Sequence, residues 1–316
     1  MGFLDRFGKK VELSVETDKP EYVPGEVVTA TVRVGGGKKD LDVEEGRAEL
    51  VCENEYEYRA ASASTRGGSS TYTETERTEH AVERFLEAGT VRAGESSAHT
   101  VSLTLPEDAV PTGKGEITEV RWKVEAILGR RRALDPDGSA EVRVVSPSSA
   151  YASRASSEPE LDTHGDCDLE VRLRQAPHAR PGDTIAGTLV ITPRSEVEAD
   201  EVRVELVRRE RVPRDHGNTE EKVDAKTILG EAADLSPGIP REYPFELSVP
   251  TEGCPTLETE HSTVRWELRG VVSRRLRSDY NVSRPLNVYT GPDDADADVG
   301  DSSTDGLGVF KEPPGG

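Results

Sequence analysis

Apolar and polar residues alternate with a period of two through most of the chain, which predicts half-buried β-strands. The pattern is clearest in residues 11–16 and 27–34, where valine, leucine and alanine alternate with glutamate, serine, threonine and arginine. It returns at residues 48–52, 101–105, 122–128 and 142–144, and again at 169–173, 202–206, 245–249 and 264–268. No long segment shows the 3.6-residue period of a helix. The chain is therefore predicted to be all-β.

Paired motifs at constant spacing indicate an internal duplication. The two tryptophans, Trp122 and Trp266, each lie in a Val-Arg-Trp segment followed by an arginine cluster, and they are 266 − 122 = 144 residues apart. Leu105 and Val249, each followed by proline, are also 144 residues apart, whereas the Pro-Gly turns at Pro24 and Pro181 are 181 − 24 = 157 residues apart. The first half therefore carries a 13-residue insertion upstream of Leu105. The polar residues 59–80 lie there and are interpreted as a long hairpin loop or a polar edge extension.

The repeat divides the chain into two units of the size of ordinary domains. We expect a first β-sandwich over residues 11–146, a Ser- and Ala-rich linker over 147–158, and a second β-sandwich over 159–290. Residues 1–10 form a short amphipathic segment. Residues 291–316 form an acidic tail with few apolar residues, for which we expect disorder.

Charge and composition narrow the class of protein. The net charge of −21 disfavours nucleic acid as a partner, because binding to phosphates requires exposed lysine and arginine. With 34% hydrophobic and 32% charged residues, the chain suits thin sandwiches with exposed outer faces. No apolar stretch approaches the roughly 18 residues of a membrane-spanning helix, and the N-terminus lacks a secretory signal pattern. We expect a cytoplasmic protein, and we keep peripheral contact with the inner face of the membrane as an additional possibility.

The sequence offers no catalytic, cofactor or metal site. Its cysteines, Cys52, Cys167 and Cys254, are isolated from one another, which supports neither a disulfide framework nor a zinc knuckle. The segment from His164 to Asp168 lacks the paired ligand spacing of a zinc site. The other histidines, His261 among them, lie in polar stretches and are expected at the surface. We therefore expect no enzyme, no cofactor and no metal.

Two groups of residues are candidates for interaction. In the N-terminal segment, Phe3, Leu4 and Phe7 lie beside basic residues, and this face either docks on the body of the protein or touches a membrane. Two basic islands follow the tryptophan segments: Arg130, Arg131 and Arg132, and then Arg274, Arg275 and Arg277. Each island is either a solvated hairpin turn or a site for an acidic partner, an anionic lipid headgroup or the acidic tail of the chain itself.

The order of the duplicated motifs resembles the arrestin-like superfamily, and within it the sporulation-control proteins of bacteria and archaea. The resemblance covers roughly residues 9–290. It rests on residues 21–26 (Glu-Tyr-Val-Pro-Gly-Glu), Leu105-Pro106 with Pro111, residues 120–126, Pro181-Gly182-Asp183, Val249-Pro250 and Trp266. The Phe-Leu-x-x-Phe opening at Phe3 also resembles the sporulation-control proteins. The chain ends Glu-Pro-Pro-Gly-Gly and lacks a PPxY motif, so a ligase-recruiting role is not carried over.

The resemblance implies two tandem arrestin-like β-sandwiches of immunoglobulin-like architecture and a non-enzymatic adaptor or regulatory scaffold. Such a scaffold would bind partner proteins through sheet edges, loops and the inter-domain concave surface. The alternative is a peripheral membrane or envelope-associated factor that uses the N-terminal amphipathic segment. A carbohydrate-binding module is disfavoured, because aromatic residues make up 5% of the chain and do not cluster. The sequence specifies neither the partner nor the oligomeric state.

Overall fold

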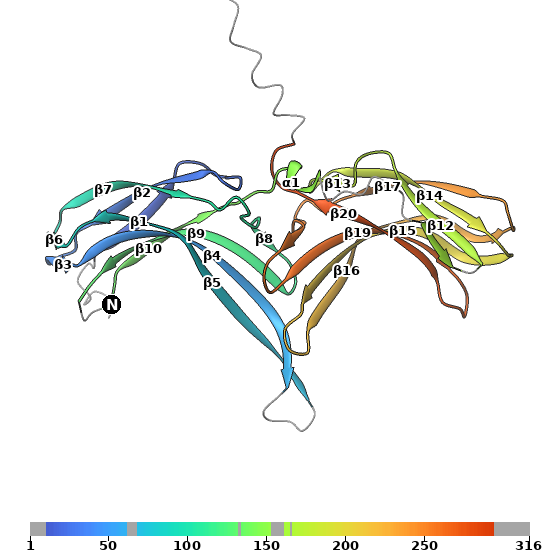
Figure 1. The fold of residues 1–316 in the computed structure, drawn as a ribbon, viewed down its shortest axis with the longest axis horizontal. Helices are drawn as coiled ribbons and strands as arrows, with labels where there is room; N and C mark the ends of the chain where they lie inside the picture. The colour runs from blue at the N-terminus through green and yellow to red at the C-terminus, as the bar shows by residue number, and fades with distance from the viewer. Residues whose placement is uncertain (1–10, 62–67, 132–133, 153–160, 165, 294–316) are drawn as a thin grey trace, which may run out of the picture.

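The computed structural model describes residues 11–61, 68–131, 134–152, 161–164 and 166–293, and it shows a β-protein with two lobes side by side (Figure 1). In the first lobe, one antiparallel sheet has the order β1-β2-β7 and the other β10-β9-β4-β5, with β8 beside β9 and a separate pair β3-β6. The strands are β1 (Glu12–Thr17), β2 (Val27–Gly35), β3 (Leu41–Val43), β4 (Glu45–Ala61), β5 (Ser69–Leu86), β6 (Gly89–Val91), β7 (Ser96–Thr104), β8 (Gly113–Lys114), β9 (Thr118–Gly129) and β10 (Asp137–Val142).

The second lobe repeats this arrangement. One sheet has the order β11-β12-β14-β17, and the other has the order β13-β20-β19-β15-β16 with β18 beside β19. The strands are β11 (Leu161–His164), β12 (Cys167–Leu173), β13 (His178–Ala179), β14 (Thr184–Pro193), β15 (Val197–Val212), β16 (Asn218–Leu235), β17 (Arg241–Ser248), β18 (Leu257–Glu258), β19 (Thr263–Ser273) and β20 (Tyr280–Val288). Every segment of predicted alternation overlaps a strand, although residues 142–144 share only Val142 with β10.

Each lobe is a sandwich because its two sheets bury every second residue against each other. In the first core, Val32 of β2 and Leu50 of β4 are fully buried with Trp122 of β9. In the second core, residues of β14 and β15 pack in the same way around Trp266. The predicted fold of two tandem β-sandwiches is confirmed. The first core also includes Cys254, Leu257 and Val264 from the second half, so the lobes share buried apolar surface at their junction.

Equivalent residues of the two halves make equivalent hydrogen bonds. The indole Nε1 of Trp122 donates to the carbonyl of Val110 at 2.8 Å, and that of Trp266 donates to the carbonyl of Cys254 at 2.9 Å. The acceptors are 254 − 110 = 144 residues apart, as the tryptophans are. The Pro-Gly turns also match, because both glycines adopt positive φ, 83° at Gly25 and 91° at Gly182, as expected of a residue without Cβ. The duplication is thus retained in the tertiary contacts.

Two long hairpins, β4–β5 and β15–β16, descend from the middle of the molecule on one side of both sandwiches (Figure 1). Leu50 faces Ala81 in the first hairpin and Leu206 faces Ala225 in the second. Leu206 follows its equivalent Leu50 by 206 − 50 = 156 residues, whereas Ala225 follows its equivalent Ala81 by 225 − 81 = 144 residues. The first hairpin is therefore 12 residues longer than the second. Nearly all of the insertion therefore lies in this hairpin, whose strand β5 takes up much of residues 59–80 and confirms the predicted polar edge extension.

The first part of the predicted linker is packed against the second half. It contains a short helix, α1 (Ser149–Ala152), and the buried Tyr151 donates its hydroxyl to the carbonyl of Thr256 at 2.6 Å. The carbonyl of Ser146 accepts the amide of Gly291 at 2.7 Å. Residues 1–10 and 294–316, for which we predicted an amphipathic segment and a disordered tail, lie outside the described residues. In the part of the chain that the structure describes, no helix is long and apolar enough to cross a membrane.

Candidate functional site

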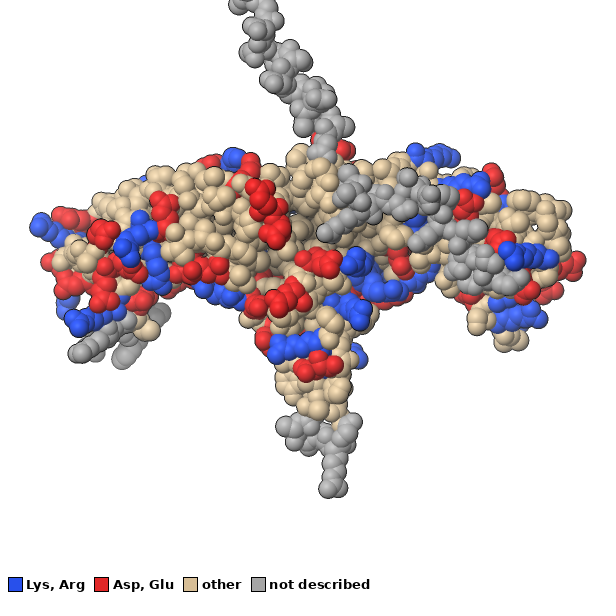
Figure 2. All heavy atoms as spheres, in the orientation of Figure 1, with Lys and Arg blue, Asp and Glu red and all other residues tan. Residues whose placement is uncertain are grey.

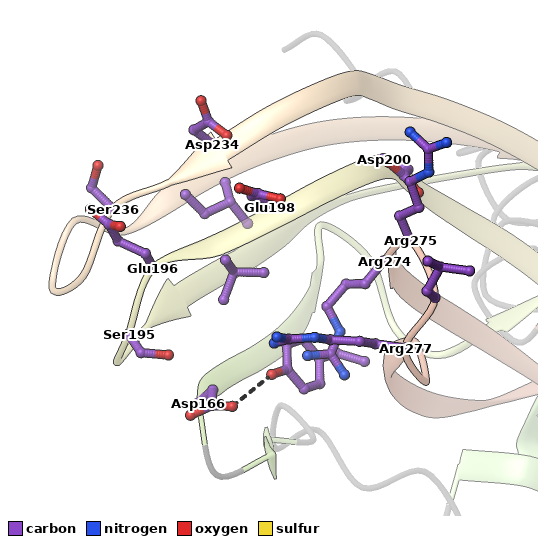
Figure 3. A pocket seen from close by; sticks show the side chains of 14 residues that line it. Asp166, Ser195, Glu196, Glu198, Asp200, Asp234, Ser236, Arg274, Arg275 and Arg277 are labelled. Carbon is purple, nitrogen blue, oxygen red and sulfur yellow. Dashed lines mark hydrogen bonds between the residues drawn. The ribbon is translucent and has the colours of Figure 1, made fainter.

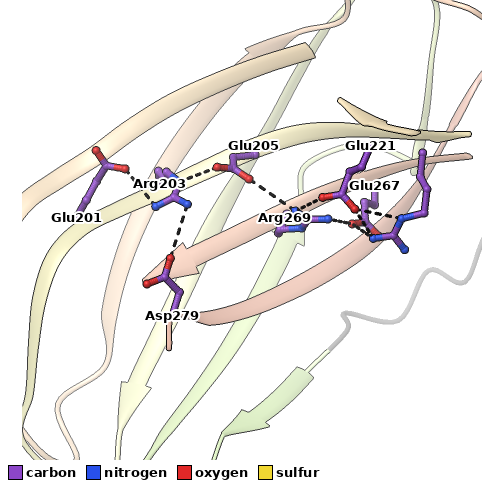
Figure 4. Close-up of polar contacts among 8 residues, drawn as sticks. Glu201, Arg203, Glu205, Glu221, Glu267, Arg269 and Asp279 are labelled. Carbon is purple, nitrogen blue, oxygen red and sulfur yellow. Dashed lines mark hydrogen bonds and ion pairs between the residues drawn. The ribbon is translucent and has the colours of Figure 1, made fainter. Parts of the chain in front are cut away.

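The sheet that contains β15, β16 and β19 carries a row of paired charges on the face turned away from the core (Figure 4). Arg203 contacts Glu205 at 2.7 Å, and the guanidinium of Arg269 contacts Glu267 at 2.6 Å and Glu221 at 2.8 Å. Hydrogen bonds from the neighbouring arginines lower the pKa of Glu221 to about 2. The row is therefore ionised at neutral pH and largely neutralised within itself.

The first sandwich carries the corresponding row on β4, β5 and β9. The buried carboxylate of Glu49 accepts from Arg47 at 2.7 Å and from Arg77 at 2.6 Å, and Arg77 also contacts Glu125 at 2.9 Å. Lys123 contacts Glu53 at 2.8 Å. These pairs lower the pKa of Glu49 despite its burial, because both arginines stabilise the charged carboxylate.

The two rows have the same geometry, but four positions differ in the sign of their charge. By strand register, Arg77 corresponds to Glu221, Glu125 to Arg269, Lys123 to Glu267 and Glu53 to Arg209. Each reversed residue is matched by a reversed partner, so the ion pairs survive the exchange. The two sandwiches consequently present different charge patterns to any partner that lies along these faces.

At the junction of the lobes, each half places a buried polar residue against a turn of the other half. Thr118 and Ser262, which are 144 residues apart, hydrogen bond to each other through their hydroxyls at 2.6 Å. Asn54 donates to Thr259 at 2.8 Å, and its equivalent Glu210 accepts the backbone amides of residues 116 and 117 at 2.8 and 2.9 Å. The halves therefore exchange contacts in the manner of a pseudo-twofold dimer.

A buried arginine lies at the centre of this junction. The side chain of Arg208 is 7% exposed and contacts Asp224 at 3.0 Å, Glu210 at 3.1 Å and Glu116 at 3.3 Å. Its guanidinium also lies over the ring of Trp266, 5.7 Å from the centroid. Because Glu116 belongs to the first half and the other partners to the second, this charge network joins the two sandwiches.

The junction also brings together a histidine and two glutamates that the sequence did not suggest as a site. His261 Nε2 is 2.5 Å from Glu76 Oε2, and the donor atoms of His261, Glu76 and Glu260 all lie within 4.8 Å of one another. Our expectation that His261 is a surface residue is only partly met, because its side chain is 27% exposed. The sequence could not reveal this cluster, because Glu76 and Glu260 are 260 − 76 = 184 residues apart.

The basic islands form the turns between β9 and β10 and between β19 and β20. Arg130 N donates to Asp135 at 2.7 Å, and Arg274 N donates to Asp279 at 3.2 Å, so the equivalent turns are closed in the same way. Arg274 also stacks on Tyr280 at 3.5 Å from its ring centroid. Figure 2 shows lysine and arginine at the lower outer end of each sandwich, with acidic side chains beside them.

In the second turn, the arginines face carboxylates across a cavity of about 850 Å³ (Figure 3). Its acidic lining comes from Asp166, Glu196, Glu198, Asp200 and Asp234. The island of Arg274, Arg275 and Arg277 is therefore partly compensated rather than purely basic. Of the other predicted interaction residues, Arg131 is exposed, while Phe3, Leu4, Phe7 and Arg132 lie outside the described residues.

Each basic turn also carries an exposed leucine that sequence reasoning missed. Leu134 is 92% exposed and Leu276 is 98% exposed, more than any other large apolar residue in the described part of the chain. Leu276 adopts a φ of 59°, in the left-handed region that costs a leucine on the order of 1 kcal/mol. Neither exposure nor strain contributes to the stability of the fold.

The cysteines have the character of core residues. Cys167 and Cys254 are buried, and Cys52 is half-buried. Burial raises the pKa of the thiol to about 12 for Cys52 and Cys254 and to about 11 for Cys167. None is therefore a thiolate at neutral pH, which disfavours a role as nucleophile.

The two halves of the chain match two different protein-family models. Residues 8–148 match the model of the arrestin (or S-antigen) C-terminal domain, and residues 164–298 match the model of the SpoOM protein. No curated protein matches the chain. The matched segments contain the strands of both sandwiches apart from most of β11, and residues 149–163 between them include most of the predicted linker.

Proposed function

We propose that this arrestin-like protein, which is similar to sporulation-control proteins, is a cytoplasmic adaptor that binds partner proteins. The arrestin-like fold has in general a non-enzymatic regulatory or adaptor role. The contact surfaces in this proposal are the free sheet edges, the loops of the hairpins and the inter-domain concave surface that bears the charge rows.

One observation carries the proposal: both long hairpins end in a free edge strand with exposed apolar side chains. Among the described residues, β5 and β16 each have a neighbouring strand on one side only. Tyr72 and Val82 on β5 are 40% and 50% exposed, and Val223 and Ile228 on β16 are 47% and 46% exposed. An edge with unpaired backbone groups and apolar side chains can accept an extended segment of a partner as an additional strand.

Lysine substitutions along these edges should remove partners while leaving the fold intact. We expect Tyr72→Lys with Val82→Lys, or Val223→Lys with Ile228→Lys, to lose proteins that co-purify with the tagged full chain, because edge lysines oppose strand addition. The measurement is quantitative mass spectrometry of the co-purified proteins. The matched control is Ile239→Lys, which alters a residue that is 54% exposed but lies outside β5 and β16.

Retention of every partner by both edge variants would show that the edges are not the contact. Thermal unfolding of each variant keeps the comparison interpretable, since surface substitutions of this kind usually change stability by within about 0.5 kcal/mol.

The exposed leucines of the basic turns favour a second candidate function, contact with a membrane surface. Leu134 and Leu276 are suited to enter the apolar layer while Arg131, Arg275 and Arg277 meet anionic headgroups. The predicted N-terminal contact through Phe3, Leu4 and Phe7 would add to the same function.

Removing the leucines should weaken binding to anionic vesicles. We expect Leu134→Ser with Leu276→Ser to lower the vesicle partition coefficient by about a hundredfold, since burial of each leucine contributes about 1.5 kcal/mol or more. The measurement is co-flotation with phosphatidylserine vesicles, with Ile239→Ser as the control. Equal partitioning of wild type and double variant would exclude the turns as the contact.

A further inference from the structure

A cluster of possible metal ligands bridges the two sandwiches. Glu76 lies on β5 of the first half, whereas Glu260 and His261 lie in the turn between β18 and β19 of the second. The imidazole Nε2 of His261 and the carboxylates of Glu76 and Glu260 converge to within 4.8 Å of one another. One nitrogen and two carboxylate donors at this separation could close around a single cation with small side-chain movements.

The turn that carries His261 is held in place by its neighbours. Thr259 Oγ1 accepts the backbone amides of His261 at 3.2 Å and of Ser262 at 2.9 Å. Thr259 in turn accepts the side-chain amide of Asn54, across the junction, at 2.8 Å. The ring of His261 packs against Tyr56, with ring centroids 5.1 Å apart. The imidazole is therefore oriented toward Glu76 by contacts that do not depend on a ligand.

The equivalent place in the other half shows what is unusual about this cluster. At a spacing of 144 residues, Glu76 corresponds to Glu220, Glu260 to Glu116 and His261 to Ile117. There Ile117 supplies no donor, and Glu116 is neutralised by Lys222 at 2.7 Å and by Arg208 at 3.3 Å.

The cluster around His261 lacks those cations. By strand register, the first half has Thr78 in place of Lys222 and Cys52 in place of Arg208. Among the described residues, neither Glu76 nor Glu260 forms an ion pair with lysine or arginine, and Glu76 pairs with the imidazole of His261. The nearby Arg214 is instead paired with Glu74 at 2.6 Å. Two carboxylates thus converge on a histidine without a fixed positive charge, in a protein whose net charge is −21. A bound dication would supply the missing charge.

We propose that Glu76, Glu260 and His261 bind one divalent transition-metal ion, for which zinc is the probe. Imidazole nitrogen and carboxylate oxygen suit zinc, and water can complete the coordination of a three-ligand site. Because the ligands come from both halves, the ion links β5 to the second sandwich and stabilises the junction. This proposal does not rest on the proposed adaptor function.

Zinc binding to the tag-free, chelator-treated full chain tests the proposal. Isothermal titration with zinc chloride should give one site per chain that His261→Gln abolishes. Glu76→Gln and Glu260→Gln should each weaken it by about tenfold or more, since loss of even a supporting partner costs roughly 10- to 100-fold. Zinc should raise the melting temperature of the wild type but not that of His261→Gln.

Two matched variants separate this site from adventitious binding. His99→Gln removes a half-buried histidine on β7, and Glu258→Gln removes an exposed carboxylate at the end of β18 that pairs with Arg265 of β19. Both should bind zinc like the wild type. Circular dichroism in chelator verifies that every variant is folded. Absence of a zinc site in the wild type, or binding that His261→Gln and Glu260→Gln leave unchanged, would overturn the proposal.

Discussion

Replacing Glu210 with glutamine is expected to lower the free energy of unfolding by about 3 kcal/mol, because it breaks a buried charge network. Glu210 is 1% exposed, and its carboxylate accepts two backbone amides of the first half while it pairs with Arg208 at 3.1 Å. Glutamine retains one carbonyl oxygen but turns an NH₂ group toward donors. Arg208 keeps its contact with Asp224 at 3.0 Å, which places the expected loss at the low end for a buried pair.

Urea denaturation of the variant measures this loss, and Glu221→Gln is its matched control. Glu221 makes the same kind of ion pair with Arg269, at 2.8 Å, but its side chain is 38% exposed. Exposed pairs contribute up to about 1 kcal/mol, so the control should lose much less than the variant at Glu210. Similar losses at both positions would mean that the junction network is no more important for stability than the surface charge rows.

The sequence predicted the fold well where local pattern and repetition determine it. The two-residue alternation located the strands, because each sandwich buries every second residue on one face of each sheet. The spacing of Trp122 and Trp266 identified positions that make equivalent hydrogen bonds in the structure. The polar insertion predicted either a long hairpin loop or a polar edge extension, and the structure shows the extended hairpin β4–β5.

The junction could not be predicted in the same way, because its contacts are non-local. In a strand pattern, Asn54, Thr118 and Glu210 look like ordinary outward-facing polar residues, yet each is buried at the junction with the other lobe. The packing of the predicted linker was hidden for a similar reason. Its serines and alanines give no sign that Tyr151 is buried and donates a hydrogen bond to the carbonyl of Thr256.

The basic islands show which features of a site can be predicted from the sequence. Their arginines were evident in the sequence, and the structure places those that it describes in two equivalent turns. The acidic lining opposite Arg274 was hidden, because it comes from strands that are distant in the sequence. The exposure and left-handed backbone of Leu276 were hidden as well, since neither can be derived from residue order.

Replacing either tryptophan with alanine should destabilise the whole molecule by about 3–5 kcal/mol, the usual cost of truncating a buried tryptophan. Trp122 and Trp266 are each 2% exposed and fill equivalent places in their cores. Because Cys254, Leu257 and Val264 of the second half belong to the first core, we expect the two sandwiches to unfold together. Both Trp122→Ala and Trp266→Ala should therefore shift a single unfolding transition.

The two variants also provide the probes that test this cooperativity. Since the chain has two tryptophans, the fluorescence of Trp122→Ala reports on the second sandwich and that of Trp266→Ala on the first. In each variant, the urea transition followed by fluorescence should coincide with the one followed by circular dichroism. The cavity in one core should destabilise the intact sandwich as well, because the two sandwiches share buried residues. Should the fluorescence of the intact sandwich instead keep the wild-type midpoint, the lobes would be independent domains and the buried junction would not couple them.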